Sequence, residues 1–223
     1  FTESRGGVGV EYTLLNDTIA PWFLNSTEQP LDPAYYHVNT SYSFNVTAVD
    51  DILISAVNLT VDGVVFTPSS LGSVYSFTSG FAAGTHTYVW TANDTVGNSN
   101  STTFTNTVLP VPTMVNLTLN GTSGNMTVQQ GYALNFTGLL VNATGPINLT
   151  VNGVVEAVGN ASLTYIKNFT TFGVFPVSLL YFGNQNDTAS NVTYEGTVEA
   201  LSQSGGGGSP LGSSEGDSFG TNI

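Results

Sequence analysis

The chain lacks cysteine and has very few basic residues: its 223 residues include two Lys or Arg and two His, against 15 Asp or Glu. Without Cys it can form neither a disulfide framework nor a thiolate-ligated metal site. A formal charge of −13 leaves no basic surface for phosphates, so we expect no nucleic-acid partner. No apolar run approaches the roughly 18 residues of a membrane helix, so we expect no membrane span.

The residues that are present are enough to build a packed core. Hydrophobic residues make up 40 % of the chain and aromatic residues 11 %, which favours folded domains over disorder. No basic segment followed by an apolar one opens the sequence, which favours a mature or processed product.

The most frequent motif is Asn-x-Ser/Thr, the acceptor sequence (sequon) for N-linked glycans. It includes 17 of the 22 Asn residues, whereas random placement of Ser and Thr would give about five such motifs. The alternative is that Asn and Thr only decorate the polar face of strands, but this does not explain their fixed spacing. The excess predicts a secreted glycoprotein. The predicted glycosylation sites are Asn16, Asn25, Asn39, Asn45, Asn58, Asn93, Asn100, Asn116, Asn120, Asn125, Asn135, Asn142, Asn148, Asn160, Asn168, Asn186 and Asn191.

Many sequons also lie in an alternating pattern of apolar and polar residues. In residues 44–48, Asn45 and Thr47 alternate with apolar residues, and the same holds in 57–61, 115–119 and 147–151. Because residues i and i+2 share one face of a strand, this pattern predicts half-buried antiparallel strands with Asn on the wet face.

The chain contains an internal duplication at an offset of 90 residues. Ten of the 25 positions in 41–65 are identical to those in 131–155. Asp62-Gly63 and Asn152-Gly153 each join two apolar runs and predict two-residue hairpin turns. The predicted strands are 19–24, 41–49, 54–61, 64–67, 73–78, 85–93 and 101–109, then 113–119, 132–141, 146–151, 153–158, 161–168, 174–183 and 190–200.

Short strands at this spacing, without helical periodicity, predict an all-β chain of two tandem immunoglobulin-like β-sandwich domains. Leu109-Pro110-Val111-Pro112 reads as a short stiff linker between them. The predicted segments are an N-terminal strand at 1–15, a first domain at 16–110, a second domain at 111–201 and a Gly/Ser-rich tail at 202–223.

The two end segments suggest roles in assembly. Val8, Val10, Tyr12 and Leu14 alternate with Gly9, Glu11 and Thr13. This segment is either a local first strand or a donor strand that pairs with the sheet edge of a neighbouring subunit. A Gly/Ser-rich tail is flexible on its own, and we expect contacts with a neighbouring subunit to order it.

One segment resembles a known family. Residues 84–98 carry Gly84, Tyr88-Val-Trp90-Thr-Ala92, Asp94 and Gly97-Asn98. This pattern resembles tandem Ig-like repeats of archaeal and bacterial secreted surface glycoproteins, of filament, surface-layer or adhesin type. The resemblance implies a tyrosine-corner role for Tyr88 and a core position for Trp90.

The second unit departs from that pattern. It has Phe175, Val177, Leu179 and Tyr181 at the corresponding inward positions. Through residues 117–122 and 183–188 it resembles a companion archaeal repeat type instead. The resemblance spans about 16–200 and suggests an archaeal origin.

The sequence offers little for catalysis or cofactor binding. A nucleophile needs a base and the base needs a partner, and we interpret His37 and His86 as structural or solvent-facing. We predict no catalytic residue, no resident metal and no cofactor beyond covalent glycans. Asp50 and Asp51 have two open interpretations: they either bind Ca²⁺ through carboxylate oxygens or lie in a solvated turn.

The preferred interpretation is a heavily N-glycosylated structural subunit of an extracellular filament or cell-surface assembly, not an enzyme. It would form a homopolymer through domain ends and terminal segments. One alternative is an adhesin or carbohydrate-binding module that contacts cell-surface glycans, with Trp22, Phe23, Tyr35 and Tyr36 as a sugar platform unless they fill the core. Another is a non-catalytic spacer of a larger secreted protein.

Overall fold

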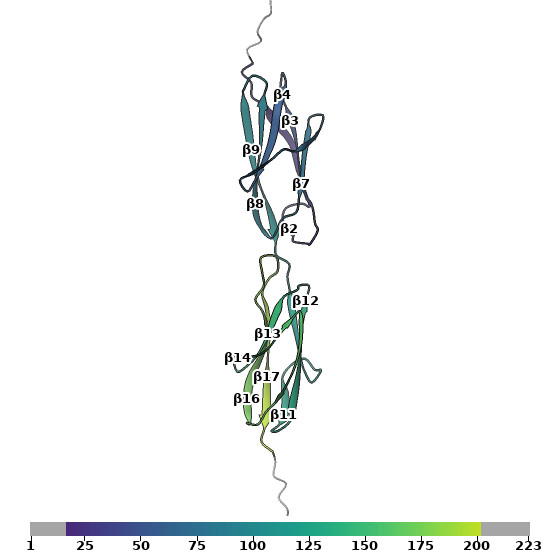
Figure 1. Cartoon of the computed structure of the whole chain (residues 1–223), viewed down its shortest axis with the longest axis vertical. Coiled ribbons are helices and arrows are strands. Elements are labelled where there is room, and N and C mark those ends of the chain that lie inside the picture. The colour runs from purple at the N-terminus through teal and green to yellow at the C-terminus, as the bar shows by residue number, and fades with distance from the viewer. Residues whose placement is uncertain (1–16, 202–223) are drawn as a thin grey trace, which may run out of the picture.

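The computed structural model describes residues 17–201, which form β-strands in two groups stacked end to end (Figure 1). The predicted all-β sandwich fold is confirmed. Asn16, the predicted N-terminal strand and the Gly/Ser-rich tail lie outside the described residues. Within those residues, no helix is long and apolar enough to cross a membrane.

The first group of strands packs as two sheets with a core between them. One sheet has the order β1-β3-β7-β6 and the other β2-β9-β8-β4-β5. The strands are β1 (Trp22–Gln29), β2 (Ala34–Tyr35), β3 (Tyr42–Val49), β4 (Ile54–Val61), β5 (Val64–Phe66), β6 (Ser69–Leu71), β7 (Val74–Ser79), β8 (Gly84–Asp94) and β9 (Ser99–Leu109).

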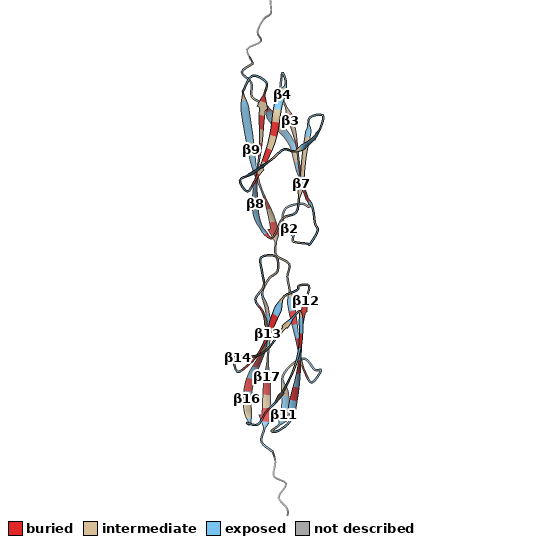
Figure 2. Cartoon of the chain, in the orientation of Figure 1, coloured by how far each residue is buried: buried red, intermediate tan, exposed pale blue. Residues whose placement is uncertain are grey.

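Alternation along the strands places this core. In β3 the buried Phe44, Val46 and Ala48 alternate with half-buried polar residues. Trp90 from β8 is 0 % exposed, so the core position implied by the resemblance is confirmed. Buried residues recur along the strands, between half-buried and exposed ones (Figure 2).

The second group forms one continuous ladder in the order β10-β12-β15-β14-β13-β16-β17-β11. The ladder folds back on itself at the β14–β15 connection, where only Asn160 and Ser162 pair. The strands are β10 (Met114–Leu119), β11 (Met126–Gln129), β12 (Ala133–Val141), β13 (Pro146–Val151), β14 (Val154–Asn160), β15 (Ser162–Asn168), β16 (Gly173–Tyr181) and β17 (Ser190–Glu199).

A second core lies inside this folded ladder. Phe136 from β12 and Leu149 from β13 are fully buried in it. Phe175, Val177, Leu179 and Tyr181 of β16 all point inward, as predicted.

Both predicted hairpin turns are confirmed. Asp62 and Gly63 have φ of 48° and 83°, and Asn152 and Gly153 have φ of 52° and 75°. Two successive residues with positive φ match the right-handed twist of the flanking strands, and Asn, Asp and Gly adopt that conformation most readily.

The strand predictions were wrong in four places. The strand predicted at 19–24 is β1 at Trp22–Gln29, because a bulge between Leu24 and Thr27, with Asn25 at φ 51°, lets it continue. Three short strands were missed, since two to four residues give too few positions for alternation to show. These are β2, β6 and β11.

Candidate functional site

The sequon asparagines form a surface set. None of the 16 that the structure describes is buried, and Asn16 lies outside the described residues. Eleven are exposed, namely Asn25, Asn39, Asn100, Asn116, Asn120, Asn125, Asn135, Asn142, Asn160, Asn168 and Asn191. Five are half-buried, namely Asn45, Asn58, Asn93, Asn148 and Asn186.

Asn106 provides the contrast. It is 0 % exposed, and it carries no sequon because Thr107 and Val108 follow it. Its Nδ2 donates to Glu28 Oε2 at 3.3 Å inside the first unit. Thus the one buried Asn among the described residues is not a glycan acceptor, whereas every described acceptor is open to solvent in part.

Several sequon side chains also hold loops, and most do so through the oxygen. Oδ1 of Asn120 accepts the Asn135 amide at 2.8 Å, and Oδ1 of Asn125 accepts the Glu195 amide at 2.9 Å. Because a glycan is attached at Nδ2, these contacts are compatible with glycosylation. Asn100 instead donates from Nδ2 to the Pro21 carbonyl at 2.8 Å, and a glycosylated amide keeps one N–H for that bond.

The junction between the two units is held by the loop 183–188. The Val111 amide donates to the Asn186 carbonyl at 2.8 Å, and the Thr188 amide donates to the Val111 carbonyl at 2.9 Å. Asn186 Oδ1 also accepts the Ala83 amide at 2.8 Å, while Gln185 Nε2 donates to the Ala83 carbonyl at 3.2 Å. Nothing in the sequence indicated that this loop contacts Ala83.

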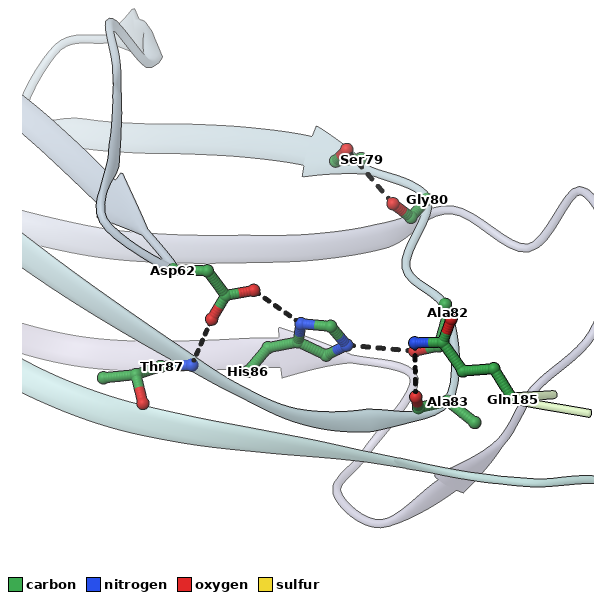
Figure 3. A network of polar contacts seen from close by, with 8 residues as sticks. All are labelled: Asp62, Ser79, Gly80, Ala82, Ala83, His86, Thr87 and Gln185. Carbon is green, nitrogen blue, oxygen red and sulfur yellow. Dashed lines mark hydrogen bonds and ion pairs between the residues drawn. The ribbon is translucent and has the colours of Figure 1, made fainter.

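His86 lies beside this junction in a structural role. Its Nδ1 is 2.7 Å from Asp62 Oδ2 and its Nε2 is 2.9 Å from the Ala82 carbonyl, as Figure 3 shows. Asp62 also accepts the Thr87 amide at 2.9 Å. Burial raises the pKa of Asp62, but the hydrogen bonds from His86 and Thr87 outweigh it and hold that pKa below its ordinary value.

Tyr88 is buried in the first core, but its hydroxyl differs from the role that the resemblance implied. It donates to Glu28 Oε2 at 3.4 Å, not to a backbone carbonyl as in a tyrosine corner. Burial, together with the Glu28 charge, raises the pKa of Tyr88 to about 12.

The second unit has an open gap between β14 and β15. On their facing sides these two strands share only the Asn160–Ser162 pair. In the first unit, β6 pairs with β7 at the corresponding place. A bulge in β14 leaves Glu156 out of register, and Glu156 accepts hydrogen bonds from Lys167 and, at 2.9 Å, from the Tyr165 hydroxyl across the gap.

The gap opens into a hollow of about 530 Å³, lined among others by Val154, Phe172 and Val174, which are exposed. It lies at the end of the second unit where β17 ends, since Gly173 in its lining pairs with Val198 of β17. Sequence reasoning missed this feature, since nothing in β14 or β15 taken alone shows that the described part of the second unit has no strand equivalent to β6.

Asp50 and Asp51 meet a third carboxylate that the sequence analysis did not include. One carboxylate oxygen from each of Asp17, Asp50 and Asp51 lies within 4.8 Å of the others. Asp50 Oδ2 accepts the amides of Ile52 and Leu53 at 3.1 and 2.9 Å, as in a solvated turn. Oxygen donors of this kind fit Ca²⁺, and calcium here stays a prediction.

No protein-family model matches the chain, and no curated protein matches it. Among solved structures it is similar to fibronectin(III)-like modules of Clostridium thermocellum CbhA, at 15 % identity and a TM-score of 0.35 over 79 % of this chain and 95 % of that one. It is similar to the Yersinia pseudotuberculosis adhesin InvE, at 14 % identity and a TM-score of 0.36 over 77 % of this chain and 58 % of that one. It is also similar to a 1.5-MDa bacterial ice-binding adhesin, at 10 % identity and a TM-score of 0.34 over 82 % of this chain and 67 % of that one. Such likeness gives no account of what this chain binds or where it acts.

The structure does not assemble the four aromatic residues suggested as a sugar platform. Trp22 pairs with Val49 at one end of the first unit, whereas Tyr35 pairs with Leu109 next to the linker. Phe23 and Tyr36 are half-buried against the first core. Of these four aromatic residues, only Tyr35 is exposed beside the junction, where its exposed fraction is 58 %.

Proposed function

We propose that the chain is a heavily N-glycosylated structural subunit of an extracellular filament or cell-surface assembly, and that it has no enzymatic activity. The observation that carries this proposal is that all 16 described sequon asparagines lie outside the two cores. The sequons lie along strands of both units, so glycans would cover most of the outer sheet faces. Lateral contact between protein surfaces would then be obstructed.

Assembly would therefore use the ends of the molecule. The described chain begins at the far end of the first unit and ends at the far end of the second (Figure 1). A contact between two such different ends is heterologous, and it propagates into a filament when it does not close into a ring.

The gap between β14 and β15 is the surface we propose for this contact. Leu163–Asn168 of β15 has a strand neighbour on one side only, so its second edge can accept main-chain hydrogen bonds from an added strand. Asn168 is exposed and is among the residues that line the hollow, and alternation places its side chain on the opposite face of β15 from Lys167, which turns to Glu156.

Residues 1–15 of a second copy are the occupant that we propose. Fully extended, they reach about 50 Å. Val8, Val10, Tyr12 and Leu14 would present one apolar face to the hollow, where Phe172 and Val174 are exposed. The gap lies at the far end of the second unit and the described chain begins at the far end of the first, as a head-to-tail contact requires.

Electron microscopy of the native material tests the proposal. We expect regular fibres with about one chain per axial repeat, and we expect a chain lacking residues 1–15 to remain monomeric. A chain lacking residues 202–223 is the parallel variant that asks whether the tail takes part. Dispersed native monomers would refute the filament, and fibres from the chain without 1–15 would refute the strand contact.

A carbohydrate-binding surface module is the second candidate. The observation in its favour is the exposed Tyr35 at the junction. Dispersed monomers that bind a saccharide would favour it over the filament subunit.

A further inference from the structure

A hollow of about 760 Å³ lies at the junction between the two units. Residues 35–38, which begin at the last residue of β2 in the first unit, form one wall, and Val111 and Pro112 of the linker form another. Asn142, which follows β12 in the second unit, also lines it. The lining is mostly apolar or aromatic, apart from His37 and the Asn142 amide.

Two further hollows adjoin the same residues. One of about 480 Å³ is lined by Tyr36, Val38 and Thr144 together with Asn186, and another of about 400 Å³ by residues 36–40 and Asn186. Asn39, Asn142 and Asn186 are all sequon asparagines. Three acceptors from separate loops therefore surround one short stretch of aromatic and apolar chain.

Asn142 is placed to carry a sugar into the largest hollow. Its φ is 63°, a conformation that Asn tolerates better than most residues. Among the side-chain hydrogen bonds of residues 17–201, none involves the Asn142 amide, so Nδ2 is free for attachment.

We propose that the hollow beside Tyr35 is a saccharide site for the chain's own N-glycan on Asn142, whose first sugars rest against Tyr35, Val38 and Pro112. This inference rests on the glycosylation proposed above. The apolar face of a hexose ring packs on an aromatic ring, as other apolar groups do. Because the sugar is tethered beside its site, even a weak contact is populated.

The consequence is a glycan that bridges the two units. It is attached to the second unit and rests on the first, so it opposes opening of the junction. The Ala83 amide reports on that opening, since its hydrogen bond to Asn186 Oδ1 connects the first unit to the loop 183–188 of the second.

The test compares Thr144→Ala with Thr144→Ser in the full chain. Both keep Asn142, but only the serine variant keeps the sequon, and Thr144 is exposed, so neither change affects a core. Glycopeptide mass spectrometry measures occupancy, and hydrogen exchange measures the Ala83 amide. We expect exchange about threefold to tenfold faster in Thr144→Ala than in Thr144→Ser. Asn116→Gln, which removes an exposed sequon on β10, is the control and should leave exchange of the Ala83 amide unchanged.

Tyr35→Ser in the glycosylated chain should accelerate exchange of the same Ala83 amide with occupancy unchanged. Equal exchange in the two Thr144 variants, with Asn142 occupied in the serine form, overturns this inference and leaves the proposed function intact. A bare Asn142 among otherwise occupied sequons does the same. Sequons that are bare throughout overturn the proposed function as well. Binding of a free saccharide at Tyr35 of the fully glycosylated chain would show an open site and overturn the inference.

Discussion

Lys167 donates a hydrogen bond to Glu156 across the gap between β14 and β15, at the two positions that Phe77 and Phe66 hold 90 residues earlier. The strand registers agree with this match, since Phe44 pairs with Phe77 and Leu134 pairs with Lys167. In the first unit the two rings pack with centroids 4.6 Å apart. The duplicated units thus have different contacts at the same place, an aromatic pair in the first and an ion pair across the gap in the second.

Restoring the aromatic pair in the second unit should fill the gap. We expect the double variant Glu156→Phe with Lys167→Phe to change the free energy of unfolding by less than about 2 kcal/mol, because an apolar pair often replaces an ion pair without loss. Fibre formation should fall at least about tenfold, since the rings occupy the space proposed for the added strand. Thermal unfolding and electron microscopy measure the two effects. A variant that polymerises as well as the parent would count against the gap as the contact.

A charge at the rim of the gap should interfere with assembly but not with folding. Val154 and Val64 are equivalent in the duplication and are 62 % and 57 % exposed. We expect Val154→Asp to slow fibre growth and Val64→Asp to leave it unchanged, with both variants within about 0.5 kcal/mol of the parent in stability. Light scattering during assembly measures the rates, and equal effects of the two changes would contradict the prediction.

The tight β14–β15 connection depends on Gly159. A Cβ at this position would lie 2.1 Å from the backbone oxygen of Ser162, so the connection would have to open. We expect Gly159→Ala to destabilise the chain by about 2–4 kcal/mol. Gly80→Ala is the matched control, because its Cβ would lie 3.7 Å from the nearest atom, an ordinary contact. Denaturant unfolding of both variants decides whether the cost is specific to Gly159.

Stability should fall in acid. Hydrogen bonds hold the pKa values of Asp62, Asp94 and Glu156 below their ordinary 3.8, 3.8 and 4.5. The unfolded chain therefore binds more protons as the pH falls, and the stabilisation present above about pH 5 is lost progressively below pH 4. Unfolding followed from pH 6 to about pH 2 measures this dependence.

Asp94→Asn isolates one of these groups. Asp94 Oδ1 accepts the amides of Val96, Gly97 and Asn98 at 2.9, 2.6 and 2.8 Å, and Asn184, at the equivalent position, accepts loop amides in the second unit in the same way. Asn keeps an acceptor oxygen but does not titrate, so the acid-side loss should be smaller in the variant. An unchanged pH profile would contradict the role given to Asp94.

Stability should also fall in strong alkali. Burial and the Glu28 charge raise the pKa of Tyr88 to about 12, whereas a tyrosine in the unfolded chain ionises near 10. The folded chain thus keeps the Tyr88 proton to a higher pH than the unfolded chain does. The free energy of unfolding therefore declines as the pH rises from 10 to 12. We expect Glu28→Gln to lower the Tyr88 pKa only in part, because burial is the larger cause. Spectrophotometric titration of tyrosinate measures it, and a Tyr88 that titrates near 10 in the parent chain would contradict the prediction.

Alternation and turn chemistry made much of the fold predictable. The Asn45 and Thr47 face of β3, the Asp62-Gly63 turn and the inward Phe175 to Tyr181 series are local patterns, and each is confirmed. Thr150 shows the limit: it shares a predicted wet face with Asn148 but is buried, beside the bulge that shifts the β13–β14 register. Bulges depend on the partner strand and leave no mark in a single strand's alternation.

The candidate sites also divide into features that local patterns predict and features that depend on distant parts of the chain. Solvent access of the sequon asparagines in alternating strands, such as Asn45 and Asn116, followed from the strand pattern, whereas the occupancy of every sequon stays a prediction. Asp17 near Asp50, Gln185 on Ala83 and Glu156 beside Lys167 bring together residues distant in sequence, and only the strand order places them.

The parallel pair of β11 and β17 has a mechanical consequence. Tension along the molecule pulls these strands in opposite directions, so the four residue pairs from Met126–Gly196 to Gln129–Glu199 are loaded in shear and must fail together. A hairpin pulled from its open end unzips one pair at a time. The corresponding pair of β2 and β9 has only two residue pairs, Ala34–Val108 and Tyr35–Leu109, so under load the first unit should yield before the second.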